Sequence, residues 1–374
     1  MWSYRYLSRM NFRVLPVILA IMSMSLLAVS SASQEGHEST IFTPLVASQL
    51  QWFGLGWLVF FLAAGLDYHK LREWTWILYG LTLLALVGVF FSPAIQNVHR
   101  WYKVPFLGIS LQPSEAAKLV VVLALSWFLE RRRTSSWSWR TSFQAALIAG
   151  IPFLLILKQP DLGTALMIPP IALVIFYIGD LNPTVVRLGT WAGGLLLLFV
   201  SCFLLGVIPH EEARSVMTKV LRDYQYERLK PDDHHHRAAA TAIALGGVTG
   251  AGWHQGEYIR GGWLPTAATD SIFSTFGEEF GLVGLTLLLA LFYALIYFCF
   301  QATAIAKDLF GRLLSAGITV YLAVHILINV GMMTGFLPIT GVPLILMSYG
   351  GSSLLATMLA LGIVQSVYSR RFMF

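Results

Sequence analysis

Long apolar runs separated by short polar connections dominate the pattern of the chain. A membrane-spanning helix needs about 20 consecutive, mostly apolar residues, because the hydrocarbon core offers no partners for backbone polar groups. Runs of this kind recur throughout the chain, and the two shortest are separated only by the KQPD stretch at 158–161. The pattern predicts ten membrane-spanning helices, at about 13–33, 46–66, 74–92, 113–129, 143–157, 162–179, 184–208, 277–301, 313–335 and 350–368.

Composition agrees with this pattern. The 374 residues are 56% hydrophobic and 12% charged, with a mean hydropathy of +0.68, whereas a soluble domain carries about a quarter charged residues. The only two cysteines, Cys202 and Cys299, lie in apolar runs, so no disulfide framework is expected. We predict an all-α integral membrane protein, a ten-helix bundle forming one domain over residues 1–374, with a large loop at 209–276 between the seventh and eighth spans.

Basic residues are concentrated in the connections on one side of the predicted bundle. The ERRRTSSWSWR stretch (130–140) and the SRR stretch (369–371) lie on that side, while the opposite short connections hold few Lys or Arg. Because cytoplasmic loops carry the excess of positive charge, both termini are predicted to be cytoplasmic and the 209–276 loop external. The net charge of +6 mostly reflects this topology and does not indicate nucleic-acid binding.

The N-terminus admits two interpretations. Basic residues between 5 and 13, an apolar run and the AVSSAS stretch (28–33) resemble a secretory signal with a cleavage site. We favour a retained first helix, since nine spans would leave the bundle without one partner.

Ionisable residues stand close to the predicted outer ends of several spans. Glu115 and Lys118 are three residues apart, so they share a helix face and can pair. Such residues inside a membrane helix are functional candidates, although a buried pair that only orients helices is an equal alternative. Asp161 precedes a predicted span, where it suits an N-cap. Pro and Gly interrupt the apolar stretch 337–353, which predicts a wet cavity floored by these loops.

The TDSIFSTFGEEFG stretch (269–281) carries three acidic residues. Thr275 and Glu278 match a capping box at the start of the eighth span, and Glu279 would favour the positive end of that helix. Asp270 precedes the predicted cap by five residues, too far for this helix. A carboxylate at the mouth of an apolar bundle is a candidate general base, with capping of a separate short helix as the alternative.

Several motifs occur together and in a fixed order: HRW (99–101), LQPSEAAKL (111–119), KQPDLGTAL (158–166), AIALGGVTGAGW (242–253), the 269–284 stretch, and HILINVGMMTGFLPITGVPLILMSYGGSS (325–353). The chain resembles the SEDS family (shape, elongation, division and sporulation proteins). The resemblance covers about 50–370, and the NVGMMTGFLPITGVPL run is more similar to elongation-type than to division-type members.

The resemblance implies a peptidoglycan glycosyltransferase that polymerises lipid II into β-1,4 glycan strands on the outer face of the bacterial cytoplasmic membrane, for cell elongation and shape. It implies a class B penicillin-binding protein, a transpeptidase, as partner, together with other membrane proteins of the elongation complex. The alternative from another class is a flippase for lipid-linked precursors, but such a transporter should show paired interruptions in both halves.

The resemblance also implies roles for residues. Asp270 would be catalytic, as the base for the acceptor hydroxyl, and Lys118, Arg100 or Arg260 would supply positive charge to the diphosphate. A divalent cation (Mg²⁺ or Mn²⁺) could share in neutralising the phosphates, and Glu115 would orient Lys118 or help hold that cation; no residue is predicted as a dedicated metal ligand. The remaining predicted substrate-binding residues are Gln112, Ser114, Asp161, Thr269, Ser348, Tyr349, Gly350 and Ser352.

The chain departs from the family pattern at several positions. Thr266 and Ala268 stand where members usually carry Glu-x-His before Thr-Asp, and Ala238 and Ala239 stand where Gln-Ser is usual. The run of histidines at 234–236 is also unusual, and adjacent histidines in an exposed loop are expected to be solvated and not metal-bound.

Overall fold

The computed structural model describes residues 4–33, 42–93, 100–103, 110–204, 207 and 234–372. Its long helices are α1 (Val14–Ala32), α2 (Pro44–Gly65), α3 (Leu71–Gly88), α4 (Pro113–Arg131), α5 (Trp139–Lys158), α6 (Leu162–Ile178), α7 (Pro183–Leu204), α12 (Ile272–Ile305), α13 (Leu309–Met333) and α14 (Gly351–Ser369). The short elements are η1 (Tyr4–Arg9), η2 (Tyr68–Lys70), η3 (Val89–Phe91), η4 (Arg133–Ser135), α10 (His234–Gly246), α11 (Glu257–Arg260) and the antiparallel strands β1 (Tyr102–Lys103) and β2 (Ser110–Leu111).

The predicted all-helical membrane bundle is confirmed in its class, and each predicted apolar run overlaps one long helix. Among the described residues, eight helices are long and apolar enough to cross a membrane. Helix α6 is apolar but shorter, and α4, which holds charged residues at both ends, is not among the eight. The crossing of the bilayer by all ten helices, and the external placement of 209–276, therefore stay predictions.

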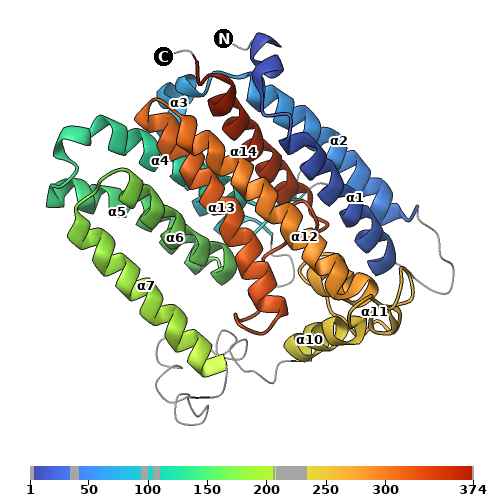
Figure 1. Cartoon of the computed structure of the whole chain (residues 1–374). Coiled ribbons are helices and arrows are strands. Elements are labelled where there is room, and N and C mark those ends of the chain that lie inside the picture. The colour runs from blue at the N-terminus through green and yellow to red at the C-terminus, as the bar shows by residue number, and fades with distance from the viewer. Residues whose placement is uncertain are drawn as a thin grey trace.

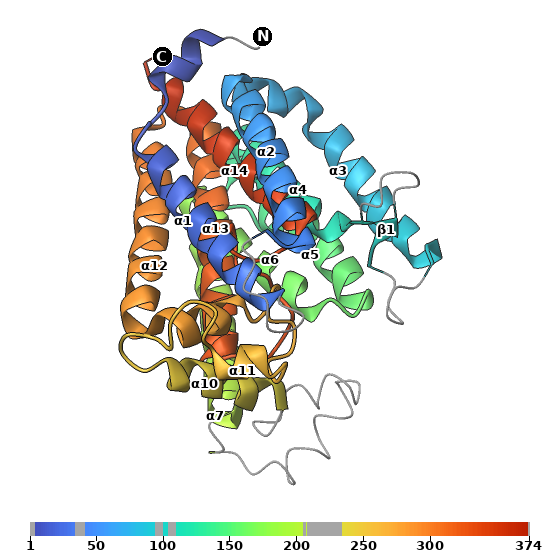
Figure 2. The same ribbon diagram turned by 90° about the vertical axis from the view of Figure 1, so that its right-hand side faces the viewer.

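Helix α13 lies at the centre of the bundle. It packs against α4, α6, α12 and α14, and 67% of its most apolar window is buried. Helix α7 lies at the edge beside α6, with none of its window buried (0%). Both ends of the chain lie at one end of the bundle, and α10 and α11 lie at the opposite end in both views (Figures 1 and 2).

The start of α12 differs from the prediction. The helix begins at Ile272, so Thr275 lies inside it and its hydroxyl donates to the carbonyl oxygen of Ala267 at 2.9 Å. Glu278 instead accepts hydrogen bonds from the backbone N–H groups of Tyr258 (2.7 Å) and Ile259 (3.2 Å), at the first turn of α11. The predicted capping box is wrong, because these donors come from an earlier loop that the local spacing cannot reveal.

Glu279 also has partners from distant parts of the sequence, while its expected interaction with the positive end of a helix stays a prediction. Its carboxylate is buried, and its Oε1 accepts hydrogen bonds from the Ser31 hydroxyl of α1 and from the backbone N–H of His254 at 2.9 Å. The His254 ring pairs with the Ser30 hydroxyl at 2.9 Å, and burial lowers the pKa of this histidine. Glu278 and Glu279 thus attach the 251–260 loop to α12 and α1.

Helix α12 is kinked at Gly281, two residues after Glu279. Gly281 has φ 61° and ψ −163°, a region that only glycine enters readily. A Cβ atom at this position would lie 2.3 Å from the backbone nitrogen of Gly250. The close backbone approach therefore requires glycine here.

We predict that Gly281→Ala destabilises the protein by about 1–3 kcal/mol from backbone strain alone, with a further cost from the clash with Gly250. Thermal unfolding in detergent measures this loss. Gly54→Ala in α2 is the control, because a Cβ there has no heavy atom within 4 Å, and it should leave the transition almost unchanged. If the two variants unfolded at the same temperature, glycine would not be required at position 281.

Candidate active site

The first turns of α4 hold a buried ion pair. Gln112 occupies the N-cap and Pro113 the first helical position, where its missing N–H costs nothing. Lys118 Nζ lies 2.8 Å from Glu115 Oε1, and the two residues are only 1% and 4% exposed. The predicted pairing is confirmed. A pair this deeply buried needs additional partners, because desolvation of both charges is costly.

Those additional partners come from α13 and α6. Lys118 Nζ lies 2.7 Å from His325 Nε2, 3.7 Å from the Met167 sulfur and 5.3 Å from the centre of the Tyr321 ring. A lysine amine carries several N–H donors, so it can donate to Glu115 and to the His325 ring together. The sequence interpretation missed His325, although an ionisable residue within an apolar run was a sufficient signal.

Asp161 joins the starts of α4 and α6. Its Oδ1 accepts from the backbone N–H of Thr164 at 3.3 Å, which confirms the predicted N-cap. Its Oδ2 accepts from Gln112 Nε2 at 2.7 Å and from the Ser114 hydroxyl at 3.3 Å. Two motifs that are far apart in sequence therefore meet through one carboxylate.

Arg100 belongs to the same region. Its Nε donates to the Gln159 carbonyl oxygen at 3.0 Å, and its Nη2 donates to the carbonyl oxygen of Pro160. The arginine thus lies against the turn that ends at Asp161, and its positive charge is at the same end of the bundle as the start of α4.

Asp270 is half-buried and immediately precedes Ser271, the N-cap of α12. The expectation that it lies beyond the first turn of this helix is therefore wrong, since α12 starts earlier than predicted. Asp270 Oδ2 lies 3.3 Å from the position a Cβ on Gly341 would occupy. Asn329 Nδ2 donates to the carbonyl oxygens of Asp270 and Val342, at 2.8 Å each. The acid therefore lies against the interrupted 337–350 segment.

Further hydrogen bonds fix the backbone before Asp270. The Ser348 hydroxyl donates to the Thr269 carbonyl oxygen at 2.6 Å, and the Tyr349 N–H donates to the Ala268 carbonyl oxygen at 2.9 Å. The next residue, Gly350, is the N-cap of α14, and the Ser352 hydroxyl donates to the Ser110 carbonyl oxygen at 2.9 Å. Ser348 and Tyr349 thus position Asp270 through the backbone.

Helix α13 brings the acid and the buried cation together. His325 and Asn329 are four residues apart and share one helix face, about 6 Å apart along the axis. His325 contacts Lys118, and Asn329 holds the Asp270 backbone. At the start of α6, a Cβ on Gly163 would lie 2.9 Å from the Thr340 hydroxyl, so the 337–350 segment also packs on that helix. The predicted motifs converge on this segment.

Some predicted residues are placed differently. Arg260 is exposed on α11, and it has no ion pair within the part of the chain that the structure describes. The histidines are not in an exposed loop: they begin α10, where His236 is buried and His235 Nε2 lies 2.7 Å from the Ser271 hydroxyl. Sequence reasoning missed this contact beside Asp270, since 36 residues separate the partners.

Within the described ranges, no group of three or more His, Cys, Asp or Glu side chains could hold a metal ion. Mg²⁺ in phosphate chemistry is commonly bound by one or two carboxylates together with the substrate phosphates. The described residues therefore do not form a dedicated metal site.

The fold and the site define a polytopic membrane protein in which one helix, α13, contacts both a buried Glu–Lys–His cluster and the backbone of a half-buried acid. A family model described as a cell cycle protein, named for FtsW, RodA and SpoVE, matches residues 8–371. The chain belongs to this family, whose members are the SEDS proteins.

Curated relatives and solved structures agree with this membership. Peptidoglycan glycosyltransferase MrdB of Escherichia coli (strain K12) is 31% identical over 370 residues, covering 96% of this chain and 93% of the relative. RodA of Thermus thermophilus superposes with a TM-score of 0.70 at 26% identity, covering 97% and 98%. A chain from a peptidoglycan synthase complex, described as coordinating polymerization and crosslinking, superposes with a TM-score of 0.76 at 28% identity, covering 98% and 99%.

We predict that Lys118→Met lowers the free energy of unfolding by about 3–5 kcal/mol, because it leaves the Glu115 carboxylate buried without its cation. The double variant Glu115→Gln/Lys118→Met should recover most of that loss, since no unpaired charge remains. Chemical or thermal unfolding in one detergent, for the wild type and each variant, measures both changes. If Lys118→Met were as stable as the wild type, the Glu115–Lys118 pair would be solvated and not buried.

Proposed function

We propose that this protein is a peptidoglycan glycosyltransferase that polymerises lipid II into β-1,4 glycan strands at the outer face of the cytoplasmic membrane, for cell elongation and shape. The observation that carries the proposal is the placement of Asp270 against the 341–342 backbone, one turn of α13 away from the Lys118 cluster. The names of the curated relatives, which are peptidoglycan glycosyltransferases, support the reaction class.

The reaction is a displacement at the anomeric carbon of the donor sugar. The acceptor hydroxyl oxygen forms the new bond to this carbon, the bond from the carbon to the phosphate oxygen breaks, and the configuration inverts from α to β. The hydroxyl proton passes to the Asp270 carboxylate, and the electron pair of the broken bond leaves with the lipid diphosphate. A general base positioned in this way contributes about 10²–10⁴-fold in rate.

Asp270 is suited to this role by its surroundings. Half-burial leaves the carboxylate access to solvent, while Asn329, Ser348 and Tyr349 hold the backbone around it through hydrogen bonds. Backbone anchoring of this kind restricts where the carboxylate can lie, which is what a proton transfer over hydrogen-bond distance requires. Thr269, Ser348 and Tyr349 therefore act as positioning residues in this proposal, and Gly350 continues the same segment.

The leaving diphosphate needs positive charge more than it needs a proton. Lys118 supplies that charge from inside the bundle, oriented by Glu115, while Arg100 lies against the turn before Asp161. Glu115 Oε2 is buried and has no hydrogen-bond partner among the described residues, so it can accept from a substrate group or a water that reaches the cluster. Gln112, Ser114 and Asp161 hold the starts of α4 and α6 together. Arg260 is exposed and has no assigned contact in this proposal.

A divalent cation, Mg²⁺ or Mn²⁺, would arrive as the counter-ion of the diphosphate and would neutralise its charge. The partner in this proposal is a class B penicillin-binding protein, which crosslinks the strands, acting with other elongation-complex membrane proteins. The solved complex that couples polymerization with crosslinking supports a partner of this kind. The protein acts as a multi-pass protein of the inner membrane with both termini in the cytoplasm.

A flippase for lipid-linked precursors is the second candidate. A secondary transporter commonly places broken helices in corresponding positions of two repeats. Among the described residues, the kink at Gly281 and the 337–350 segment interrupt the long helices, and both lie in the C-terminal half. Their placement favours an enzyme site at one end of the bundle.

We expect Asp270→Asn to abolish glycan polymerisation by the purified protein with its partner transpeptidase, because the amide cannot accept the hydroxyl proton. Gel analysis of polymer made from labelled lipid II measures this. Asp180→Asn is the matched control: Asp180 is exposed in the α6–α7 turn with φ 51°, a conformation that Asn tolerates, and it should polymerise normally. Normal polymer from the Asp270 variant would reject the base assignment.

The Glu115→Gln/Lys118→Met variant separates a catalytic from a purely structural pair. We expect it to retain the fold and the partner while polymerisation falls by at least about 10²-fold, as for removal of one preorganised electrostatic group. A folded double variant with wild-type polymerisation would assign the pair to helix packing alone. Exchange of labelled lipid II across vesicle membranes, equal for wild type and variants, would argue against transport.

A further inference from the structure

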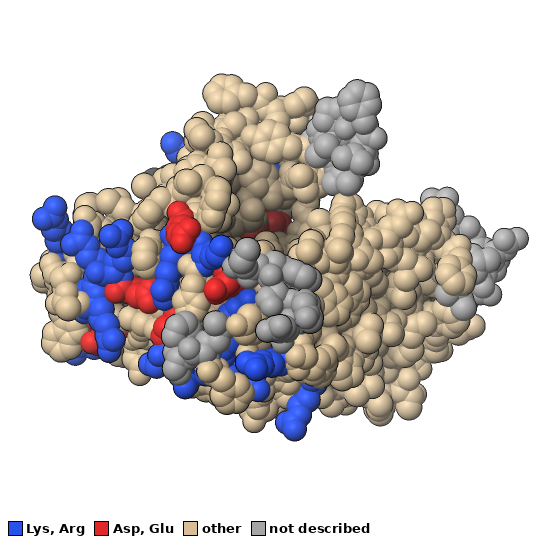
Figure 3. Space-filling view, turned by 90° about the horizontal axis from the view of Figure 1, so that it is seen from above, with Lys and Arg blue, Asp and Glu red and all other residues tan. Residues whose placement is uncertain are grey.

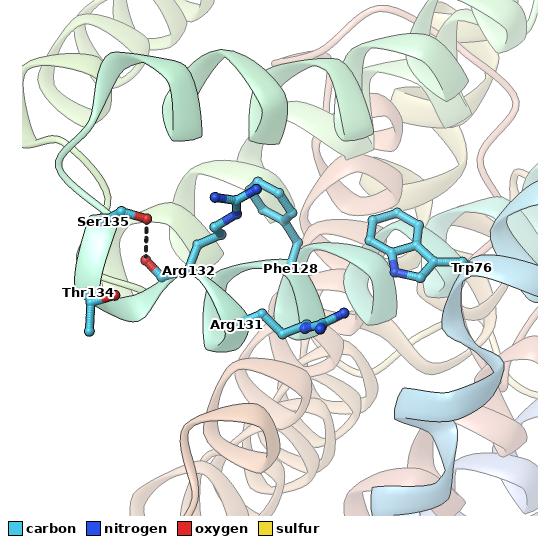
Figure 4. Close-up of a pocket in the computed structure, with 6 residues that line it drawn as sticks. All are labelled: Trp76, Phe128, Arg131, Arg132, Thr134 and Ser135. Carbon is cyan, nitrogen blue, oxygen red and sulfur yellow. Dashed lines mark hydrogen bonds between the residues drawn. The ribbon is translucent and has the colours of Figure 1, made fainter.

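A second polar site lies at the opposite end of α4. A cavity of about 470 Å³ is lined by Trp76 of α3, by Phe128, Arg131 and Arg132 at the end of α4, and by Thr134 and Ser135 of η4 (Figure 4). Sixteen residues separate Glu115 from Arg131, which places this cavity roughly 24 Å along the helix from the ion pair. The cavity is therefore distinct from the proposed active site, and nothing in the proposed reaction uses it.

The two arginines are not neutralised by the protein that surrounds them. The nearest acid in sequence, Glu130, is engaged by Arg72 at 2.7 Å. In the ranges that the structure describes, neither Arg131 nor Arg132 forms an ion pair. The Arg131 guanidinium instead lies 5.3 Å from the centre of the Trp127 ring, which restricts its position. Figure 4 shows it extending toward Trp76, with the Arg132 guanidinium beside the Phe128 ring.

A helix C-terminus favours cations, and so does a cytoplasmic loop, so charge alone would not define a site. This cavity adds aromatic walls and two hydroxyl groups, those of Thr134 and Ser135. The Ser135 hydroxyl donates to the Arg132 carbonyl oxygen at 3.3 Å, which places it within the cavity wall. Planar guanidinium groups donate paired hydrogen bonds to phosphate oxygens, and hydroxyl groups can add further donors.

Apolar surface adjoins the cavity. On α3, Ile77, Leu81 and Leu84 follow Trp76 at helical spacing and are 54%, 58% and 69% exposed. On α5, Trp139 and Phe143 are 63% and 65% exposed. Lys and Arg side chains gather over the α4–α5 connection on the face that is seen from the end carrying both termini (Figure 3). A cationic pocket above exposed apolar helices matches a phospholipid and not a free anion.

We propose that this cavity binds the phosphate headgroup of an anionic phospholipid from the leaflet on the side of the two termini. Arg131 and Arg132 contact the phosphate, the Thr134 hydroxyl donates to its oxygens or to the glycerol, and the acyl chains lie along α3 and α5. Basic pockets between membrane helices on the cytoplasmic side commonly take such headgroups. The site would fix the depth and orientation of α4, the helix whose other end carries Glu115 and Lys118.

The test titrates phosphatidylglycerol or phosphatidylcholine into the purified full-length protein in detergent and counts bound lipids by native mass spectrometry. The wild type should retain phosphatidylglycerol selectively. Arg131→Gln/Arg132→Gln should weaken this retention by about ten- to thirtyfold, as expected for two charges near an anionic headgroup. Arg187→Gln/Arg312→Gln is the control, since it removes the same charge from exposed positions outside the cavity and should retain the lipid.

The milder variant Thr134→Val/Ser135→Ala keeps both charges and should weaken retention severalfold, which preserves the test if the arginine variant fails to fold. An equal loss in both arginine variants would overturn the proposal in favour of diffuse surface charge. Equal retention of the two lipids by the wild type would also overturn it. Displacement of bound phosphatidylglycerol by inorganic phosphate at equal concentration would show a site for a free anion and would reject the lipid.

Discussion

Lys118 and Glu115 have almost no exposed surface, so their charges must be satisfied by the protein around them. The Glu115 carboxylate and the His325 ring contact the ammonium group directly, and Met167 and Tyr321 complete its surroundings. Removal of any one charged partner would leave an isolated charge in an apolar bundle. This requirement fixes the mutual placement of α4, α6 and α13. One turn of α13 beyond His325, Asn329 donates hydrogen bonds to the loops that carry Asp270 and Val342.

The loops at this end of the bundle are held by hydrogen bonds between polar groups that lie far apart in the sequence. Glu278 and Glu279 satisfy backbone donors of the 254–259 loop, and the kink at Gly281 allows α12 to continue past them. Asn329 and Ser348 hold the segment that carries Asp270. The acid is therefore placed by buried hydrogen bonds at one end of the bundle, and the cation by an ion pair within it. A glycosyl transfer from a lipid diphosphate needs both.

Local patterns predicted much of this arrangement. Apolar run lengths located every long helix, because the bilayer permits few other structures, and i,i+3 spacing predicted the Glu115–Lys118 pair. The N-cap role of Asp161 was visible, since its donor lies three residues away. The roles of Glu278, Glu279 and His325 could not be derived, because their partners lie 19 to 248 residues away and only the fold brings them together. The spacing of Thr275 and Glu278 predicted a capping box, but both side chains bind groups that lie further away in the sequence.

In the proposed reaction Asp270 takes the proton of the acceptor hydroxyl, and Lys118 stabilises the leaving diphosphate. A structure of the protein with its partner, bound to lipid II and an unreactive donor analogue, measures this directly. We expect the acceptor hydroxyl within about 2.6–3.2 Å of the Asp270 carboxylate, and the donor diphosphate on the side of Lys118 and Arg100. An acceptor hydroxyl held by another group, with Asp270 turned away from both sugars, would contradict it.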